Sequence, residues 1–179
     1  VTAIEKGNYI ADKRSLIQLQ NHASLFGDTP FALNDFTIHK RDSSPMIVIH
    51  TFINGELLNS YWADGLIVST PTGSTGYNLS CGGPVVLPQS NNFVITPIAP
   101  HHLNVRSIVV SDASVISFEV EGRGSEFICT MDARSEVVNM NTQVAVHKAE
   151  HSITLVRLND NNFLSTLTQK LNWGKDNRN

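Results

Sequence analysis

The stretch Thr70-Pro-Thr-Gly-Ser-Thr75 has the composition of a loop that binds a polar ligand. It follows the apolar run 66–69, which predicts a short buried strand, and it precedes residues 75–80, for which we expect a short helix. Small hydroxyl residues and glycine at such a junction leave backbone N–H groups free to bind phosphate or other polar ligand atoms. The alternative interpretation is structural, with Thr72 or Ser74 as the N-cap of the helix.

This loop matches neither of two common nucleotide-binding motifs. No lysine follows Gly73, as a Walker loop requires, and the glycines are not spaced as Gly-x-Gly-x-x-Gly. The seven histidines form no metal-ligand pattern. His101 and His102 are adjacent, so on a strand their side chains would point to opposite faces, and His147 and His151 lie in strand-like sequence. We therefore expect no metal site.

Two further polar positions are candidates for ligand contact. Asn34 and Asp35 stand between an apolar stretch and a predicted strand. The amide can donate and accept hydrogen bonds while the carboxylate only accepts them, a combination that suits ribose hydroxyls or an amine. Asp64 precedes Gly65 at the start of a predicted strand. For all three polar residues the structural alternative is a turn or cap role.

Strand and turn signals alternate along the chain and predict a mainly β fold. Asn54-Gly55 is a strong hairpin signal between two of the strands. Strands this short and regularly spaced favour an antiparallel β-sandwich or a twisted two-sheet domain. Leu164, Leu167 and Leu171 form one apolar stripe, which predicts a C-terminal helix over residues 163–171. The predicted strands cover residues 46–53, 57–61, 66–69, 93–98, 107–110, 115–120, 127–131, 144–147 and 152–158.

Composition narrows the class of protein. The 179 residues suit a β-rich domain over residues 1–160, followed by the helix and a polar tail over 161–179. The net charge is −3 without a basic run, which argues against nucleic-acid binding, and no apolar stretch reaches the ~18 residues of a membrane span. Cys81 and Cys129 match no zinc or redox spacing. We expect both to be buried and reduced in a cytoplasmic protein.

The segment Asp64-Gly-Leu-Ile-Val-Ser-Thr-Pro-Thr-Gly-Ser-Thr-Gly-Tyr77 resembles the signature loop of the NAD kinase family. Four other segments are also similar to that family, in the same order along the chain. They are Phe31-Ala-Leu-Asn-Asp35, Leu79-Ser-Cys-Gly-Gly-Pro84, Pro100-His-His-Leu-Asn-Val-Arg106 and Lys170-Leu-Asn-Trp-Gly174.

The resemblance implies a kinase that uses ATP, with Mg²⁺ or another divalent metal, to phosphorylate the 2′-hydroxyl of the adenosine ribose of NAD and form NADP. In the family, a catalytic aspartate lies in a Gly-Gly-Asp-Gly motif of an N-terminal α/β domain. The sequence has no such motif, since Pro84 follows Gly82-Gly83, and it begins at Val1 without a methionine. We expect this chain to be the NAD-binding domain alone, without a catalytic residue and inactive by itself, from a homo-oligomeric dimer or tetramer.

The same resemblance implies roles for individual residues. Asn34 and Asp35 would lie along the bound dinucleotide, Asp64 would hold the nicotinamide end across a subunit contact, and Tyr77 would stack near the adenine. Many relatives have alanine at Gly76, a change that keeps a backbone contact. The expected substrate-binding residues are Asn34, Asp35, Asp64, Ser74, Thr75, Gly76, Tyr77, Ser80 and Arg134.

Two residues depart from the family pattern and leave the ligand preference open. Trp62 stands where some relatives carry a basic residue, and it cannot neutralise a phosphate. Arg134 stands where relatives often have glutamine, and it would either reach an anionic part of the ligand or lie in solvent. Two alternative functions remain: a lipid or diacylglycerol-type kinase of the same superfamily, and a noncatalytic β-sandwich binding module.

Overall fold

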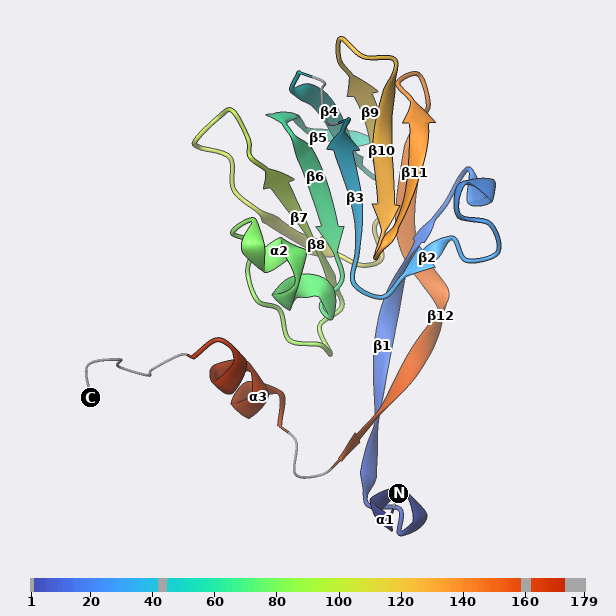
Figure 1. The fold of residues 1–179 in the computed structure, drawn as a ribbon, viewed down its shortest axis with the longest axis vertical. Coiled ribbons are helices and arrows are strands. Elements are labelled where there is room, and N and C mark those ends of the chain that lie inside the picture. Colours follow the sequence, from blue (N-terminus) through green and yellow to red (C-terminus); the bar gives the residue numbers. More distant parts are fainter. Residues whose placement is uncertain (1, 42–44, 159–161, 173–179) are drawn as a thin grey trace, which may run out of the picture. The chain divides into compact units, whose positions relative to one another are not determined.

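The structure is a computed structural model that describes residues 2–41, 45–158 and 162–172. Within these residues the chain forms two six-stranded antiparallel sheets (Figure 1), so the predicted two-sheet, mainly β fold is confirmed. The chain divides into two compact units, a large one of residues 14–153 and a small one of residues 1–13 with 154–179. No helix in the described part of the chain is long and apolar enough to cross a lipid bilayer.

The first sheet has the strand order β2-β1-β12-β9-β4-β5. Its strands are β1 (Tyr9–Leu19), β2 (Phe31–Ala32), β4 (Ile47–Ile53), β5 (Glu56–Ala63), β9 (Ile116–Glu121) and β12 (Val144–Leu158). The second sheet has the order β11-β10-β3-β6-β7-β8. Its strands are β3 (Asp35–Lys40), β6 (Gly65–Ser69), β7 (Asn92–Ile98), β8 (Ile108–Ser111), β10 (Glu126–Met131) and β11 (Arg134–Asn139).

One buried apolar cluster joins the two sheets. Phe36 of β3 stacks on Phe118 of β9, with ring centroids 5.9 Å apart, and both side chains are fully buried. Aliphatic side chains from strands of both sheets complete the cluster. Because side chains alternate across a strand, a β3 that turns Phe36 and Ile38 into this core must turn Asp35, Thr37 and His39 to its other face.

The hairpin between β4 and β5 follows the sequence signal. Asn54 and Gly55 both have positive φ, 52° and 84°, as a two-residue turn of the kind favoured by Asn-Gly requires. The Asn54 side chain also accepts a hydrogen bond from the backbone N–H of Val115, at 2.9 Å. This turn sets the register in which Ile53 pairs with Glu56.

Several details of the strand prediction were wrong. Strands β1, β2 and β11 were not predicted, and the two strands expected at 144–147 and 152–158 form the single strand β12. The exposed residues Lys148 and Glu150 flank the buried Ala149 and lie on the outer face of this one continuous strand.

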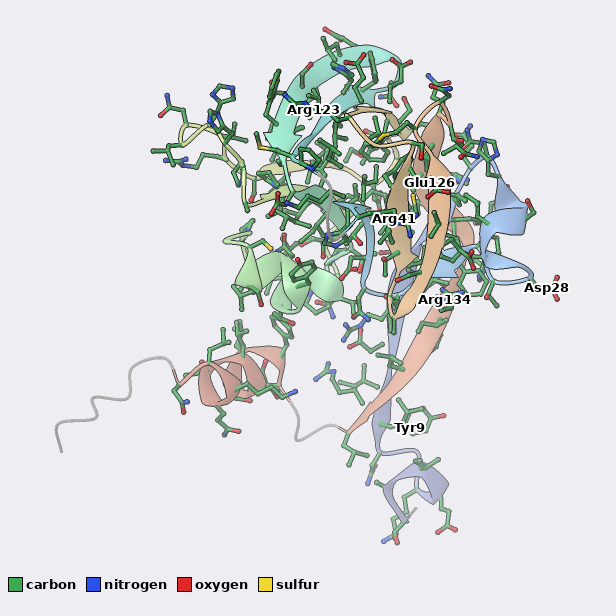
Figure 2. The ribbon with its side chains drawn as sticks, turned by 45° about the horizontal axis from the view of Figure 1, so that its top comes forward. Tyr9, Asp28, Arg41, Arg123, Glu126 and Arg134 are labelled. Atoms are coloured by element: carbon green, nitrogen blue, oxygen red, sulfur yellow. The ribbon has the colours of Figure 1, made fainter. Side chains whose placement is uncertain are left out.

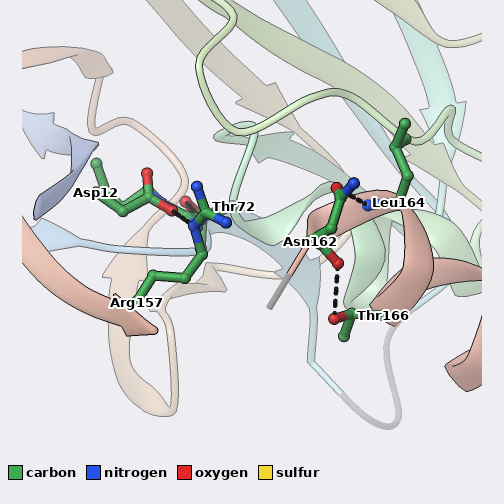
Figure 3. A network of polar contacts seen from close by, with 7 residues as sticks. Asp12, Thr72, Arg157, Asn162, Leu164 and Thr166 are labelled. Carbon is green, nitrogen blue, oxygen red and sulfur yellow. Dashed lines mark hydrogen bonds and ion pairs between the residues drawn. The ribbon is translucent and has the colours of Figure 1, made fainter. Parts of the chain in front are cut away.

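Among the described residues, three short helical elements lie outside the sheets and outside residues 70–80. They are α1 (Thr2–Glu5), the 3₁₀ turn η1 (Ala23–Phe26) and the C-terminal helix α3 (Phe163–Lys170). Helix α3 confirms the predicted C-terminal helix, and the Asn162 side chain caps it by accepting from the Leu164 N–H at 3.1 Å (Figure 3). Leu167 is buried whereas Leu164 is 57% exposed, so the leucine stripe is only partly covered. In the same small unit, Arg157 pairs with Asp12 at 3.7 Å (Figure 3).

One fold prediction concerns Thr51 of β4, whose hydroxyl is fully buried and has no hydrogen-bond partner among the described residues. Thr51→Val replaces that hydroxyl with a methyl group of similar size. We expect the free energy of unfolding to rise by about 1 kcal/mol, because a buried polar group without a partner opposes folding. Urea denaturation measures the change.

The matched control is Thr96→Val on β7. Thr96 is equally buried, but its hydroxyl bonds to Asn78 Oδ1 at 2.7 Å and to Ser107 Oγ at 2.9 Å. This substitution should lower the free energy of unfolding, because it leaves the buried Asn78 carbonyl without that donor. A loss of stability in Thr51→Val as large as in Thr96→Val would contradict the prediction.

Candidate functional site

A cavity of about 550 Å³ opens over the polar face of β3. Strand β3 supplies one side, the turn between β10 and β11 supplies another, and the end of the signature loop supplies a third. The cavity is lined by Asn34, Asp35, Thr37, His39, Gly76, Tyr77, Thr130, Asp132 and Ala133. It therefore brings together four residues that the sequence singled out, Asn34, Asp35, Gly76 and Tyr77.

The signature loop packs directly against the Asn34 backbone. The Thr70 N–H donates to the Asn34 carbonyl oxygen at 2.9 Å, and the Thr70 hydroxyl donates to the Leu33 carbonyl oxygen at 2.6 Å. A Cβ atom at Gly73 would lie 2.1 Å from the Asn34 carbonyl oxygen, so only glycine allows this approach. The two segments that were candidates separately in the sequence are thus one structural unit.

The other side of the Asn34-Asp35 segment is held by Asp132 of the β10–β11 turn. Its carboxylate accepts hydrogen bonds from the backbone N–H groups of Leu33 at 2.9 Å, Asn34 at 2.8 Å and Asp35 at 3.4 Å. The Asp132 N–H in turn donates to the Asp35 carbonyl oxygen at 3.1 Å. The sequence analysis did not select Asp132, although its neighbour Arg134 was selected.

The side chain of Asp35 is 8% exposed and faces this second carboxyl group. Burial, and to a lesser degree the charge of Asp132, raise the pKa of Asp35 to about 6. Ionisation of Asp35 therefore costs free energy in the folded protein. Such a shifted pKa is typical of residues that bind a ligand rather than of residues that stabilise the fold.

An aromatic pair forms another part of the wall. The rings of His39 and Tyr77 stack with centroids 5.8 Å apart and planes inclined by 20°. Burial lowers the pKa of His39, and the nearby charge of Asp64 partly opposes that shift. Tyr77 remains 41% exposed, and burial raises the pKa of its hydroxyl. A neutral, planar wall beside polar groups suits a flat heteroaromatic ring.

Ser74 has a different environment from the one expected of a ligand contact. It lies in the 3₁₀ turn η2 (Gly73–Thr75) and is fully buried. Its hydroxyl donates to the Pro71 carbonyl oxygen at 2.8 Å and accepts from the Val86 N–H at 3.0 Å. These bonds occupy the hydroxyl and hold the loop in shape.

Asn78 is the centre of the same buried network and was missed in the sequence. It lies in helix α2 (Tyr77–Ser80), and its amide nitrogen donates to the carbonyl oxygens of Ser74 at 2.9 Å and Pro84 at 3.0 Å. A Cβ atom at Gly83 would lie 2.0 Å from the Asn78 amide oxygen. The structural alternative, in which Thr72 or Ser74 caps the helix, is not observed: Thr72 is the N-cap residue of η2 but makes no side-chain capping hydrogen bond, and Ser74 lies within η2. The N-cap of α2 is Gly76.

The remaining predicted residues lie outside the cavity lining. Thr75 is exposed on the loop and Ser80 is exposed on α2. Asp64 forms an ion pair with Lys40 at 2.8 Å and is partly exposed. The exposed Trp62 lies on β5.

Arg134 is neither a free surface side chain nor part of the cavity lining. Its guanidinium donates to the Thr29 carbonyl and hydroxyl oxygens at 2.5 and 2.6 Å and to the Phe31 carbonyl oxygen at 2.5 Å. It also lies over the Phe26 ring at 5.8 Å. Figure 2 shows Arg134 at one end of the β10–β11 ribbon, with the Arg41–Glu126 ion pair towards the other end. Through these hydrogen bonds Arg134 stabilises residues 29–31, which precede Asn34-Asp35 in the chain.

The structure also places the adjacent histidines and the two cysteines. His101 and His102 lie in a loop, and their rings contact edge to face with centroids 5.4 Å apart. Cys129 is buried as predicted, whereas Cys81 is partly exposed, and both are free thiols.

Comparison with known proteins identifies the family. Residues 33–158 match the family model described as the ATP-NAD kinase C-terminal domain. The chain belongs to the NAD kinase family. The matched range begins beside Asn34-Asp35 and includes the whole cavity lining, so the site described above lies within the family's own domain. The comparisons support neither of the two alternative functions.

Relatives of known name agree with this assignment. The chain is 55% identical to an NAD kinase of Cytophaga hutchinsonii over all 179 residues, which span 61% of that relative. Its fold matches the yeast NADH kinase complexed with NADH, with a TM-score of 0.79 and 25% identity over 95% of this chain and 50% of that one. An Archaeoglobus fulgidus NAD kinase in complex with ATP gives 0.77 and 26% over 96% and 63%. The chain thus spans half to two thirds of these proteins.

The contact between the loop and Asn34 gives a testable prediction. In Gly73→Ala the new methyl group must displace the Asn34 carbonyl oxygen, so we expect the free energy of unfolding to fall by about 1–3 kcal/mol. Gly76→Ala is the matched control, because its Cβ would meet only the Gly73 carbonyl oxygen at 3.3 Å. Chemical denaturation of both variants measures the difference. Equal stability of the two variants would show that the Gly73 contact is unimportant.

Proposed function

We propose that this chain is the dinucleotide-binding part of an ATP-dependent NAD kinase, which transfers a phosphoryl group from ATP to the 2′-hydroxyl of the adenosine ribose of NAD and so forms NADP. One observation carries the proposal. The signature loop and the Asn34-Asp35 segment, far apart in the sequence, form one cavity in a chain whose named relatives are NAD kinases. The fold neighbours bound to NADH and to ATP also support it.

Phosphoryl transfer depends mainly on the positioning of its reactants and on neutralisation of charge. The cavity supplies the positioning. The ionised Asp35 carboxylate accepts hydrogen bonds from hydroxyl or amine groups of NAD, and the Asn34 amide both donates and accepts them. The ring of Tyr77 offers a flat surface for a base, while Gly76 allows close approach of the ligand to the backbone. Thr75 and Ser80, exposed on the loop and on α2, would add hydroxyl contacts to the bound NAD.

Divalent metal would enter the reaction bound to ATP. The described residues hold no group of three or more His, Cys, Asp or Glu side chains that could bind a metal ion. The catalytic aspartate would belong to a Gly-Gly-Asp-Gly motif, which these 179 residues do not contain. We therefore propose that this chain by itself binds NAD without phosphorylating it. In this proposal residues 1–160 form the NAD-binding domain and residues 161–179 a C-terminal extension. The two free thiols suit the cytoplasm.

The first test is kinetic. In the full-length enzyme, Asn34→Ala and Asp35→Ala each remove hydrogen bonds to a partly buried ligand, worth about 1–3 kcal/mol. We expect kcat/KM for NAD to fall roughly 10- to 100-fold in each variant. Asn141→Ala and Asp28→Ala make the same changes at exposed sites away from the cavity and should leave the kinetics unchanged. Unaltered kinetics in both cavity variants would refute the assignment.

We further propose that the protein is a homo-oligomer in which Asp64 reaches the ligand of a neighbouring subunit. The partial exposure of Asp64, outside the lining of its own cavity, supports this role. Closed symmetric dimers, or tetramers built from them, are the common forms of such assemblies.

Subunit mixing tests the shared site. Asp64→Ala and Asp35→Ala should each have strongly reduced activity, but a mixed oligomer should recover part of it, because one site then combines Asp35 of the first variant with Asp64 of the second. The subunits are mixed after reversible dissociation, and light scattering reports assembly. A strictly monomeric active enzyme would eliminate the shared site.

A further inference from the structure

We propose that Asp132 is a positioning residue of this cavity, which holds Asn34 and Asp35 in their ligand-binding conformation through three backbone amide groups. The inference rests on the proposed function, because it assigns a role to Asp132 in dinucleotide binding. Its foundation is geometric. Four hydrogen bonds, three accepted by the carboxylate and one donated by the backbone, join one turn residue to the three consecutive residues Leu33, Asn34 and Asp35.

The backbone of Asp132 indicates that this arrangement is specific. Its φ is +52°, in the left-handed region that non-glycine residues seldom adopt. It lies in the two-residue turn between Met131 and Arg134, which are paired across β10 and β11. Aspartate tolerates the left-handed region better than most residues do, and here it also brings a carboxylate to the amides of a segment 97–99 positions earlier in the chain.

Asp132 also acts on Asp35 through its charge. The groups that face Asp35 are Asp132 from the β10–β11 turn, His39 from the same face of β3, and Tyr77 from α2. Burial is the larger cause of the raised pKa of Asp35, and the charge of Asp132 adds to it. Asp35 therefore loses its negative charge as the pH falls through about 6, whereas an ordinary aspartate keeps it to about 3.8. Affinity for a ligand that needs the ionised form should fall over the same range.

Asp132→Asn is the direct test, in the full-length enzyme with NAD as the probe. The asparagine oxygen can still accept from Asn34 and Asp35, but its amide nitrogen cannot accept from Leu33. We expect KM for NAD to rise about tenfold, with kcat nearly unchanged, since one hydrogen bond to a charged group is lost. Because the substitution removes a negative charge, the acid limb of the pH profile of 1/KM should move to lower pH.

A purely structural role for Asp132 predicts something else. Loss of folded protein would lower activity at every pH and leave the midpoint of the acid limb in place. Asp132→Gly is the second variant, because glycine accepts the left-handed backbone without strain while removing the carboxylate. It should show the same shift of the midpoint and a larger rise in KM.

Glu56→Gln is the control for net charge, since it removes one negative charge from β5 of the other sheet. Its pH profile should match the wild type. If Asp132→Asn and Asp132→Gly keep the wild-type KM and midpoint, the positioning role is overturned while the kinase assignment stands. If the wild-type enzyme does not use NAD, the proposed function itself fails, and the two failures are thereby distinguished.

Discussion

The Asn34 carbonyl oxygen is the point at which the loop and the strand of the site meet. The Thr70 N–H donates to it, and Gly73 passes so close that no side chain would fit between them. The carboxylate of Asp132 accepts a hydrogen bond from the backbone N–H of the same residue, Asn34. Hydrogen bonds at both its carbonyl and its N–H therefore restrict the orientation of the Asn34 backbone. Its side chain is therefore presented to the cavity by a rigid support, which is how a binding site limits the entropy lost when a ligand is ordered.

This rigidity is combined with an electrostatic cost. Asp35 and Asp132 place two carboxyl groups at one cavity wall, and the pKa of Asp35 is raised to about 6. An acid with a pKa above its ordinary value makes the folded state more stable at low pH. That contribution is lost as the pH rises from about 3.8 through 6, and near neutral pH the folded protein carries the unfavourable charge. Stability alone would not select such a pair, whereas a ligand that donates hydrogen bonds to Asp35 offsets the cost.

The sequence predicted those parts of the fold that depend on neighbouring residues. The Asn54-Gly55 turn, the buried strand 66–69 and the C-terminal helix follow from local composition and periodicity, and they were found. Residues Asn78 and Asp132 could not be found in this way. Each acts on backbone groups that are brought to it by the fold, such as the amides of residues 33–35 for Asp132. Arg134 shows the same limit, because its partners near residues 29–31 lie more than 100 positions away.

The signature loop contains residues that hold its own conformation and residues that line the cavity, and its sequence alone does not tell the two kinds apart. Thr70, Ser74 and Asn78, spaced four apart, are fully buried and bond to backbone groups of the loop or of the strand segment beside it. Gly76 and Tyr77 stand between the last two of these positions and line the cavity. The inward residues hold the shape of the loop, and the outward ones line the cavity in which we propose that NAD binds. A substitution within this motif can therefore impair binding by either route, and measured stability distinguishes the routes, because only the inward residues contribute to folding through buried hydrogen bonds.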